Sequence, residues 1–187
     1  MQQSRGRILG ISGSLQSRSS NTAIVRLASS LADQCSYVDV FDTLQLLPYF
    51  NPDLDVEPAP GAVADLRARA RAADAVLIAS PEYAHEMPGV LKNALDWLVS
   101  SGELYGKPVA ILCAAPGPER GIYVRQALER TLDAEGAKIV ASATVVVPPS
   151  QRNGQPSAEV VQVVTDAVRA LAGRDAACAD TMPRRSA

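Results

Sequence analysis

The sequence predicts an α/β fold in which a parallel sheet of five strands is covered by helices on both faces. Short apolar runs alternate with segments of helical periodicity along the chain, and one of these runs is apolar throughout. A continuous apolar run is typical of a strand covered on both faces, and regular alternation with helices is typical of doubly wound sheets. The length of 187 residues fits one domain, which we place at residues 1–173.

The first half of the chain contains three of the expected strands. The run RILGIS ends at a glycine, SYVDVFD alternates, and AVLIAS is apolar throughout. Apolar residues recur at helical spacing after each run, and Pro88 suits a first helical turn, where the missing N–H costs little. The expected strands cover 7–12, 36–42 and 75–80, and the expected helices cover 23–31, 61–73 and 88–101.

The second half repeats the pattern twice. Strands are expected at 107–115 and 138–147, and helices at 121–135 and 160–171. The segment 174–187 shows no periodicity, and we expect it to be a disordered tail.

Right-handed crossovers leave few topologies for such a sheet. We favour the flavodoxin-like strand order 2-1-3-4-5 over a classical Rossmann order. Ligands of such sheets bind outside the carboxyl ends of the strands, at the switch point between strands 1 and 3. This rule selects the loops 12–21, 80–89 and 114–121 as the candidate site.

Composition excludes several classes of function. A net charge of −2 argues against a nucleic-acid-binding surface, and no apolar run is long enough to predict a membrane span. The N-terminus has basic residues but no long apolar stretch after them, so it does not predict a secretory signal. Cys35, Cys113 and Cys178 are widely spaced, which favours reduced thiols in the cytoplasm. One histidine and scattered cysteines predict no metal site.

The first loop, SGSLQSRSSN, is rich in small donors and ends at the start of a helix. Helix N-termini favour anions, so a phosphate is one candidate ligand, with Arg18 as an additional charge. The alternative is a serine-rich turn in which Ser19 or Ser20 caps the helix. No Gly-x-Gly-x-x-Gly and no Walker lysine is present, so a dinucleotide or ATP site is not expected.

The second loop, SPEYAHEMPG, is bounded by two prolines that hold the backbone away from helical geometry. Its amides and carbonyls are therefore free to face a flat heteroaromatic ring, with Tyr83 packed beside it. In the alternative interpretation Glu82 is a solvated charge, Tyr83 packs in the structure and His85 is structural.

The pattern GSL…S.N after the first strand and PEY…PGVLKNALDW after the third resembles the NADPH-dependent FMN reductase family of flavodoxin-like quinone, azo-dye and chromate reductases. The resemblance extends over roughly residues 6–172. It implies that the first loop holds the FMN phosphate and that the second lines the isoalloxazine ring. The implied FMN-binding residues are Ser12, Ser14, Gln16, Ser19, Asn21, Pro81, Glu82, Tyr83, Ala84, His85, Pro116 and Gly117.

The sequence departs from the family pattern in two loops. Gln16 stands where the family often has arginine, so Arg18 is a candidate replacement for that charge. The third loop, AAPGPERG, is stiffened by prolines where the family is often glycine-rich with a serine. Because of this stiffer loop, we do not assume that the protein has the usual substrate range of the family.

The resemblance implies hydride transfer from NADPH or NADH through FMN to quinone-like or other small acceptors. FMN supplies the chemistry, so no catalytic side chain is assigned. One alternative is an electron-carrier flavodoxin, which usually has a threonine-rich phosphate loop and a strongly acidic surface that this chain lacks. A second is a biosynthetic flavin oxidoreductase that acts on one pathway intermediate.

The resemblance also implies a homodimer or homotetramer in which neighbouring subunits help to wall the flavin site. We expect the helix 88–101 to contribute to the interface through Trp97 and Leu98. Burial of Trp97 in the core is the alternative.

Overall fold

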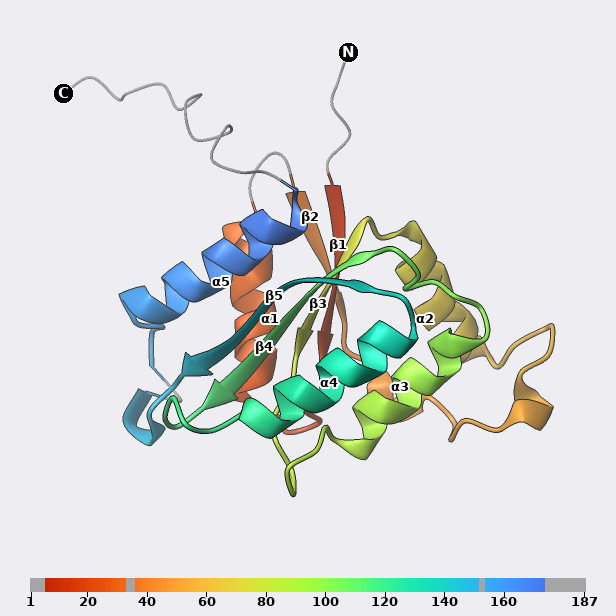
Figure 1. The fold of residues 1–187 in the computed structure, drawn as a ribbon, viewed down its shortest axis with the longest axis horizontal. Coiled ribbons are helices and arrows are strands. Elements are labelled where there is room, and N and C mark those ends of the chain that lie inside the picture. Colours follow the sequence, from red (N-terminus) through yellow and green to blue (C-terminus); the bar gives the residue numbers. More distant parts are fainter. Residues whose placement is uncertain (1–5, 33–35, 152–153, 174–187) are drawn as a thin grey trace, which may run out of the picture.

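The computed structural model describes residues 6–32, 36–151 and 154–173. Five parallel strands form one sheet in the order β2-β1-β3-β4-β5, which confirms the predicted flavodoxin-like topology (Figure 1). The predicted tail at 174–187 lies outside the described residues. The strands are β1 Gly6–Ser12, β2 Ser36–Phe41, β3 Ala75–Ala79, β4 Pro108–Ala115 and β5 Lys138–Val146.

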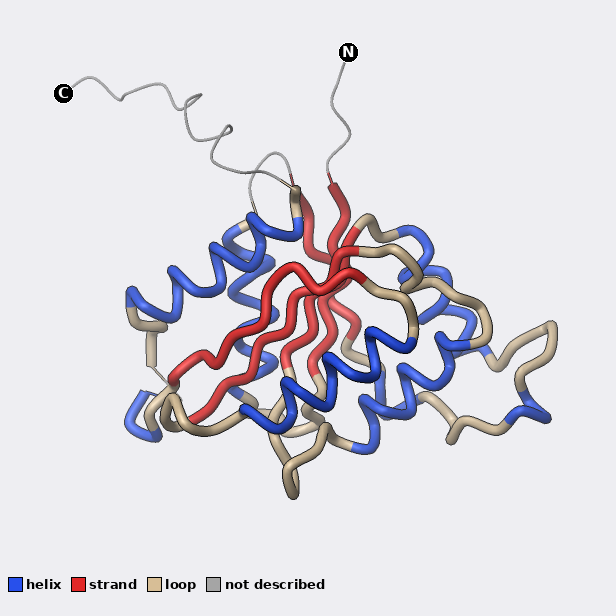
Figure 2. Tube along the Cα trace, in the orientation of Figure 1, coloured by secondary structure: helices blue, strands red, loops and turns tan. Residues whose placement is uncertain are grey.

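Helices cover both faces of the sheet (Figure 2). Alternate residues of a strand point to opposite faces, and the two faces of β1 and β3 pack into two different apolar cores. One core contains α1 and α5, and the other contains α2, α3 and α4. The helices are α1 Ser20–Leu31, α2 Gly61–Ala72, α3 Gly89–Val99, α4 Ile122–Ala134 and α5 Ala158–Leu171.

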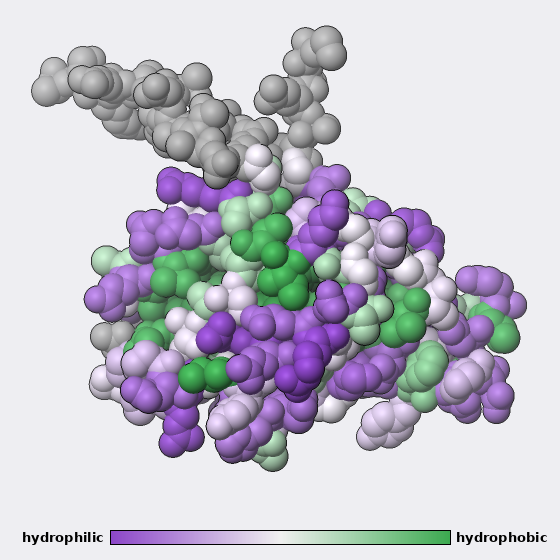
Figure 3. Space-filling model, viewed as in Figure 1, coloured by the Kyte–Doolittle hydropathy of each residue, from purple (hydrophilic) through white to green (hydrophobic). Residues whose placement is uncertain are grey.

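The central strand β3 is buried at all of its positions, as its continuous apolar sequence predicts. β5 is the edge strand next to β4 and is only half-buried along most of its length. Figure 3 shows apolar side chains in the region of β5 above a hydrophilic band over α4. The sheet therefore has a fully covered centre and one partly open apolar edge.

Trp97 and Leu98 lie in the core, which corrects the expectation that they face a neighbouring subunit. Their side chains are 0% and 1% exposed. The physical reason is the segment 43–60, which folds back over α3. The indole Nε1–H donates a hydrogen bond of 2.8 Å to the carbonyl oxygen of Pro48, and the ring of Phe50 packs edge-on at 5.1 Å between centroids.

The same segment is fixed to the domain along its length. It contains the short 3-10 helices η1 Leu44–Leu46 and η2 Pro52–Leu54, and it projects to the right in Figure 1. The amide of Asn93 in α3 accepts from the N–H of Phe50 at 2.7 Å and donates to Pro48 at 2.9 Å. Arg67 in α2 pairs with Asp55 at 2.7 Å. These contacts make 43–60 an ordered arm.

Glu135 follows the last turn of α4, and its carboxylate has an unfavourable environment. Both of its oxygens are buried and have no hydrogen-bond partner within the described residues. Burial raises the pKa of Glu135 to about 7, and the negative charge of Asp96 adds to this effect, whereas Lys92 opposes it. The folded protein therefore holds a proton on this group at a pH where the unfolded chain does not.

We predict that Glu135→Gln stabilises the protein at pH 8 but not at pH 4.5. The pKa of Glu135 is higher in the folded than in the unfolded state. Its carboxyl group therefore contributes most to the free energy of unfolding below about pH 4.5, and this contribution is lost as the pH rises to about 7. Removing the ionisable group should raise the free energy of unfolding at pH 8 by about 1–3 kcal/mol, the lower end applying where solvent screens the charge. Urea denaturation at the two pH values measures this.

The matched control for this experiment is Asp133→Asn, which removes an exposed carboxylate from the same end of α4. Its pH-dependent effect should be much smaller. Equal effects of the two variants would show that Glu135 is not exceptional.

Candidate functional site

The three predicted loops meet at the carboxyl edge of the sheet. The N–H of Gly13 donates to the carbonyl oxygen of Ala79 at 2.8 Å, which joins the first loop to β3. The N–H of Ser80 donates to Leu112 at 2.9 Å, which joins the second loop to β4. Asn21 accepts from the N–H of Ala114 at 2.9 Å, which joins α1 to the start of the third loop. The loops are thus fixed to one another through the sheet.

The first loop presents backbone donors at the start of α1. Ser19 is the N-cap, and its hydroxyl oxygen accepts from the N–H of Thr22 at 3.3 Å. Within the described residues, no acceptor is found for the N–H groups of Arg18, Ser20 and Asn21. Free N–H groups at the positive end of a helix dipole are suited to bind an anion. The two interpretations of the first loop, a serine cap and an anion site, are therefore compatible.

Gly13 allows this loop to lie close to the next one. A Cβ at this position would lie 2.9 Å from Leu91 Cδ2 and 3.0 Å from Ser80 Oγ. Ser80 is fully buried, and its hydroxyl donates to the carbonyl oxygen of Pro81 at 3.0 Å. Only a residue without a side chain fits here unless the two neighbours shift.

The side chains expected to contact phosphate fall into two groups. Ser12 and Asn21 are buried and already bonded, to Thr22 at 2.8 Å and to the third loop. Ser14 is half-buried and Gln16 is exposed, and the Ser14 hydroxyl accepts from the N–H of Gln16 at 3.3 Å. Direct phosphate contact therefore remains a prediction for all of them, and the geometry favours Ser14, Gln16 and the backbone.

The second loop forms a tight hairpin. Tyr83 and Glu86 exchange two backbone hydrogen bonds of 2.9 and 3.0 Å. Ala84 and His85 between them have φ angles of 51° and 66°, in the left-handed region that non-glycine residues rarely adopt. Pro81 is half-buried, and the Tyr83 side chain is 55% exposed. The hairpin therefore offers its backbone and an aromatic ring to a ligand.

Glu82 has a partner that sequence reasoning missed. Its carboxylate accepts from the N–H groups of Tyr123 and Val124 at 3.0 and 3.1 Å. The N-cap of α4 is Gly121, which has no side chain and a φ of 82°. Glu82 therefore caps α4 from another loop, and its negative charge lies at the positive end of the helix dipole. The only signal in the sequence is a helix start without a capping side chain.

The third loop has free space beside Gly117. A Cβ at Gly117 would meet nothing within 4 Å, and Pro116 is exposed. The loop is held by two hydrogen bonds of Arg120, whose N–H donates to Gly117 at 3.2 Å and whose carbonyl accepts from Thr144 at 3.1 Å. This loop leaves room beside Gly117 for a bound ring.

Cys113 lies beneath this loop and is not a candidate nucleophile. Burial raises the pKa of its thiol to about 11, and the charge of Glu82 adds to the effect while Arg125 opposes it. The thiol is therefore neutral near pH 7. A Cβ at Gly121 would lie 2.5 Å from the Cys113 sulfur, so the thiol packs against the left-handed turn that begins α4.

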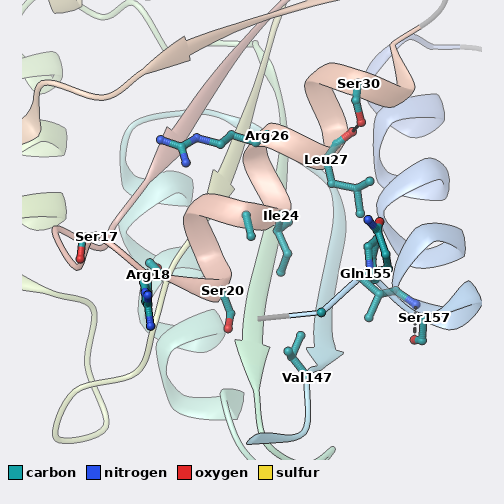
Figure 4. A pocket seen from close by; sticks show the side chains of 15 residues that line it. Ser17, Arg18, Ser20, Ile24, Arg26, Leu27, Ser30, Val147, Gln155 and Ser157 are labelled. Atoms are coloured by element: carbon teal, nitrogen blue, oxygen red, sulfur yellow. Dashed lines mark hydrogen bonds between the residues drawn. The ribbon is translucent and has the colours of Figure 1, made fainter. Parts of the chain in front are cut away.

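A cavity of about 470 Å³ lies behind the first loop, between α1 and α5 (Figure 4). Ser17, Arg18 and Ser20 line one end, and the rest is lined by apolar side chains such as Ile24 and Val160 together with the polar residues Arg26, Ser30, Gln155 and Ser157. No residue of the second or third loop contributes to it. The cavity therefore shares Arg18 and Ser20 with the start of α1, and the second and third loops lie outside it.

Among the described residues, no group of three metal-ligating side chains that could hold a metal ion is found. No described helix is both long enough and apolar enough to cross a membrane.

The fold and the loops define a flavodoxin-like protein whose first helix begins with N–H groups suited to an anion, beside two loops that expose backbone and an aromatic ring. The family model of the NADPH-dependent FMN reductases matches residues 6–152, and the chain belongs to this family. The sequence motifs had indicated the same family.

Two curated relatives illustrate the similarity. An NAD(P)H-dependent FMN reductase of Pseudomonas aeruginosa is 43% identical over 113 residues, which are 59% of this chain and 60% of the relative. A quinone reductase of Escherichia coli is 32% identical over 129 residues, which are 67% of this chain and 69% of the relative. The match thus spans only about 60% of the length of the Pseudomonas protein.

Solved structures agree with the fold. FerB, a flavoenzyme NAD(P)H:(acceptor) oxidoreductase from Paracoccus denitrificans, superimposes with a TM-score of 0.73 at 23% identity. The superposition covers 90% of this chain and 96% of FerB. At this level of identity the likeness supports the architecture alone.

We predict that Glu82→Ala lowers the free energy of unfolding by about 1–2 kcal/mol, because two N–H groups at the start of α4 lose their acceptor. Glu82→Gln keeps one acceptor oxygen but loses the charge, so its effect should be smaller. Urea denaturation measures both. The control is Glu119→Ala, an exposed acidic residue of the third loop. If the two alanine variants unfold alike, Glu82 does not cap α4.

Proposed function

We propose that this protein is an FMN-dependent oxidoreductase that passes hydride from NADPH or NADH to quinone-like or other small acceptors. The observation that supports this most directly is the set of N–H groups at the start of α1 for which the described part of the chain offers no acceptor, next to two loops with exposed backbone and aromatic surface. Family membership supplies the identity of the ligand, because the matching family is that of NADPH-dependent FMN reductases.

In this proposal the first loop holds the FMN phosphate. The N–H groups of Arg18 and Ser20, the hydroxyl of Ser14 and the side chain of Gln16 supply donors. A phosphate here also meets the positive end of the α1 dipole, so a nearby arginine in place of Gln16 is not essential. One phosphate-sized loop without a second nucleotide motif favours FMN over FAD.

The second and third loops hold the ring in this proposal. Residues 81–85 supply one wall and residues 116–117 the other, while Glu82 holds the first of these walls against α4. Bound between these walls, FMN would supply the hydride-transfer chemistry between the nicotinamide and the acceptor. The task of the chain is to bind, orient and shield the reacting rings, and no side chain is assigned a catalytic role.

We also propose that the protein is a homodimer or a homotetramer. The arm 43–60 supports a first interface, because it is ordered but exposes large apolar side chains to solvent. The exposed edge of β5, where Ile139 and Val140 are 37% and 42% exposed, is a candidate second interface. The exposed apolar residues of the arm are Leu46, Tyr49, Leu54 and Val56.

We place the protein in the cytoplasm, where NADPH and NADH are available as donors. The buried, neutral thiol of Cys113 is consistent with a reducing compartment.

The visible spectrum of the purified protein tests the function. Anaerobic NADPH or NADH should bleach a yellow protein, and heat should release FMN. A protein that takes up no FMN, or that releases FAD, would contradict the cofactor assignment. A yellow protein that neither nucleotide reduces would support the electron-carrier alternative.

We predict that Ser14→Ala weakens FMN binding about tenfold, the effect of losing one hydrogen bond to a charged group. Fluorescence titration of the apoprotein with FMN measures the Kd. Ser17→Ala is the control, because Ser17 is an exposed serine of the same loop that is not assigned to the phosphate. Equal affinities of the two variants would remove Ser14 from the phosphate site.

We predict ping-pong kinetics with NADPH and a simple quinone. Donor and acceptor must each bring a reacting atom within about 3–3.5 Å of the same bound ring. Because they share one binding surface, the donor must leave before the acceptor binds. Double-reciprocal plots should be parallel, with mutual competition at high concentrations. Intersecting lines and a ternary complex would show two separate surfaces.

A further inference from the structure

The tip of the hairpin 83–86 packs against the first turn of α4 through two side-chain rings. The rings of His85 and Tyr123 lie with their centroids 4.1 Å apart and their planes tilted by 50°. Both side chains are exposed, so this contact is not part of the apolar core. Contacts of this kind between rings contribute beyond the area they bury.

Tyr123 is joined to the second loop twice. Its ring contacts His85, and its backbone N–H donates to Glu82 at 3.0 Å. A third link lies further along α4, where Arg130 pairs with Glu86 at 3.7 Å. This pair is exposed, so it contributes little. The main links between the hairpin and α4 therefore converge on Tyr123.

The hairpin needs such links because its backbone is strained. Ala84 and His85 both have left-handed φ angles, which are disfavoured for residues with a side chain. Strained residues persist where surrounding contacts hold them. For His85 the described contact of the side chain is the ring of Tyr123.

We propose that Tyr123 is a positioning and specificity-determining residue of the site. Its ring holds the His85 end of the hairpin against α4. We use the term aromatic wall for this pair and the exposed ring of Tyr83 on the same hairpin, and the wall favours flat, fused-ring acceptors over small non-planar ones. The specificity part rests on the proposed function, whereas the positioning part does not.

The positioning part is tested without any cofactor. His85 is the only histidine of the chain, so proton NMR of the tag-free, full-length apoprotein shows one histidine ring. The ring current of Tyr123 should displace the His85 signals from their unfolded positions, and Tyr123→Leu should remove most of this displacement. Tyr105→Leu, which changes an 81% exposed tyrosine that the His85 ring does not contact, should not. Unchanged His85 signals in folded Tyr123→Leu would overturn the proposal.

The specificity part is tested by the ratio of kcat/KM for 2-methyl-1,4-naphthoquinone to that for ferricyanide. Tyr123→Leu should lower this ratio roughly fivefold to tenfold, and Tyr123→Phe should restore most of it. A ratio that Tyr123→Leu leaves unchanged overturns the assignment of specificity. FMN affinity, measured in parallel by fluorescence, shows separately whether the proposed cofactor binds.

Two glycine variants separate strain from ring contact. Ala84→Gly and His85→Gly both relieve a left-handed residue, but only His85→Gly removes a ring. We expect Ala84→Gly to keep the acceptor ratio of the parent and His85→Gly to lower it as Tyr123→Leu does. If both glycine variants lower the ratio equally, backbone strain sets the selectivity and the wall does not.

Discussion

The common direction of the five strands is the constraint on which the site depends. Because β1, β3 and β4 run in parallel, the loops that follow them leave the sheet at the same edge. The register of the strands then fixes the depth of each loop, and backbone hydrogen bonds from Gly13 and Ser80 continue the ladder into the loops. The site is an extension of the sheet, so the position at which its first two loops begin is set by the strands beneath them.

Polar side chains add further hydrogen bonds between the loops and the helices. Asn21 reaches from α1 to the backbone of the third loop, and Glu82 reaches from the second loop to the start of α4. Each satisfies backbone N–H groups that would otherwise lack an acceptor. Both belong to loop or helix-start positions that sequence motifs associate with ligand binding, and Oδ1 of Asn21 and Oε2 of Glu82 accept hydrogen bonds from the protein itself. Each side chain thereby shapes the site, and its direct contact with a ligand stays a prediction.

Much of this arrangement was predictable from local sequence. Apolar periodicity located the strands and helices, and the serines before an apolar helix offered a cap at Ser19 or Ser20, of which Ser19 is the N-cap. The fate of Trp97 was not predictable, because the segment that covers it lies about fifty residues earlier and has no periodic pattern. The cap of α4 by Glu82 joins positions separated by 41 residues and was missed for the same reason. Local patterns specify elements, whereas contacts between distant loops depend on the assembled sheet.

At some loop positions the packing of neighbouring side chains determines whether the residue is glycine, and at others it does not. At Gly13 the adjoining side chains leave no room for a Cβ, and at Gly121 the thiol of Cys113 does the same. At the hairpin tip the reverse holds: the backbone favours glycine, but the chain has Ala84 and His85. Glycines in these two places would relax the turn but would also widen the range of conformations open to the tip. A side chain at a left-handed position keeps the tip in one conformation at some cost in stability, and the ring of Tyr123 lies where it can offset part of that cost.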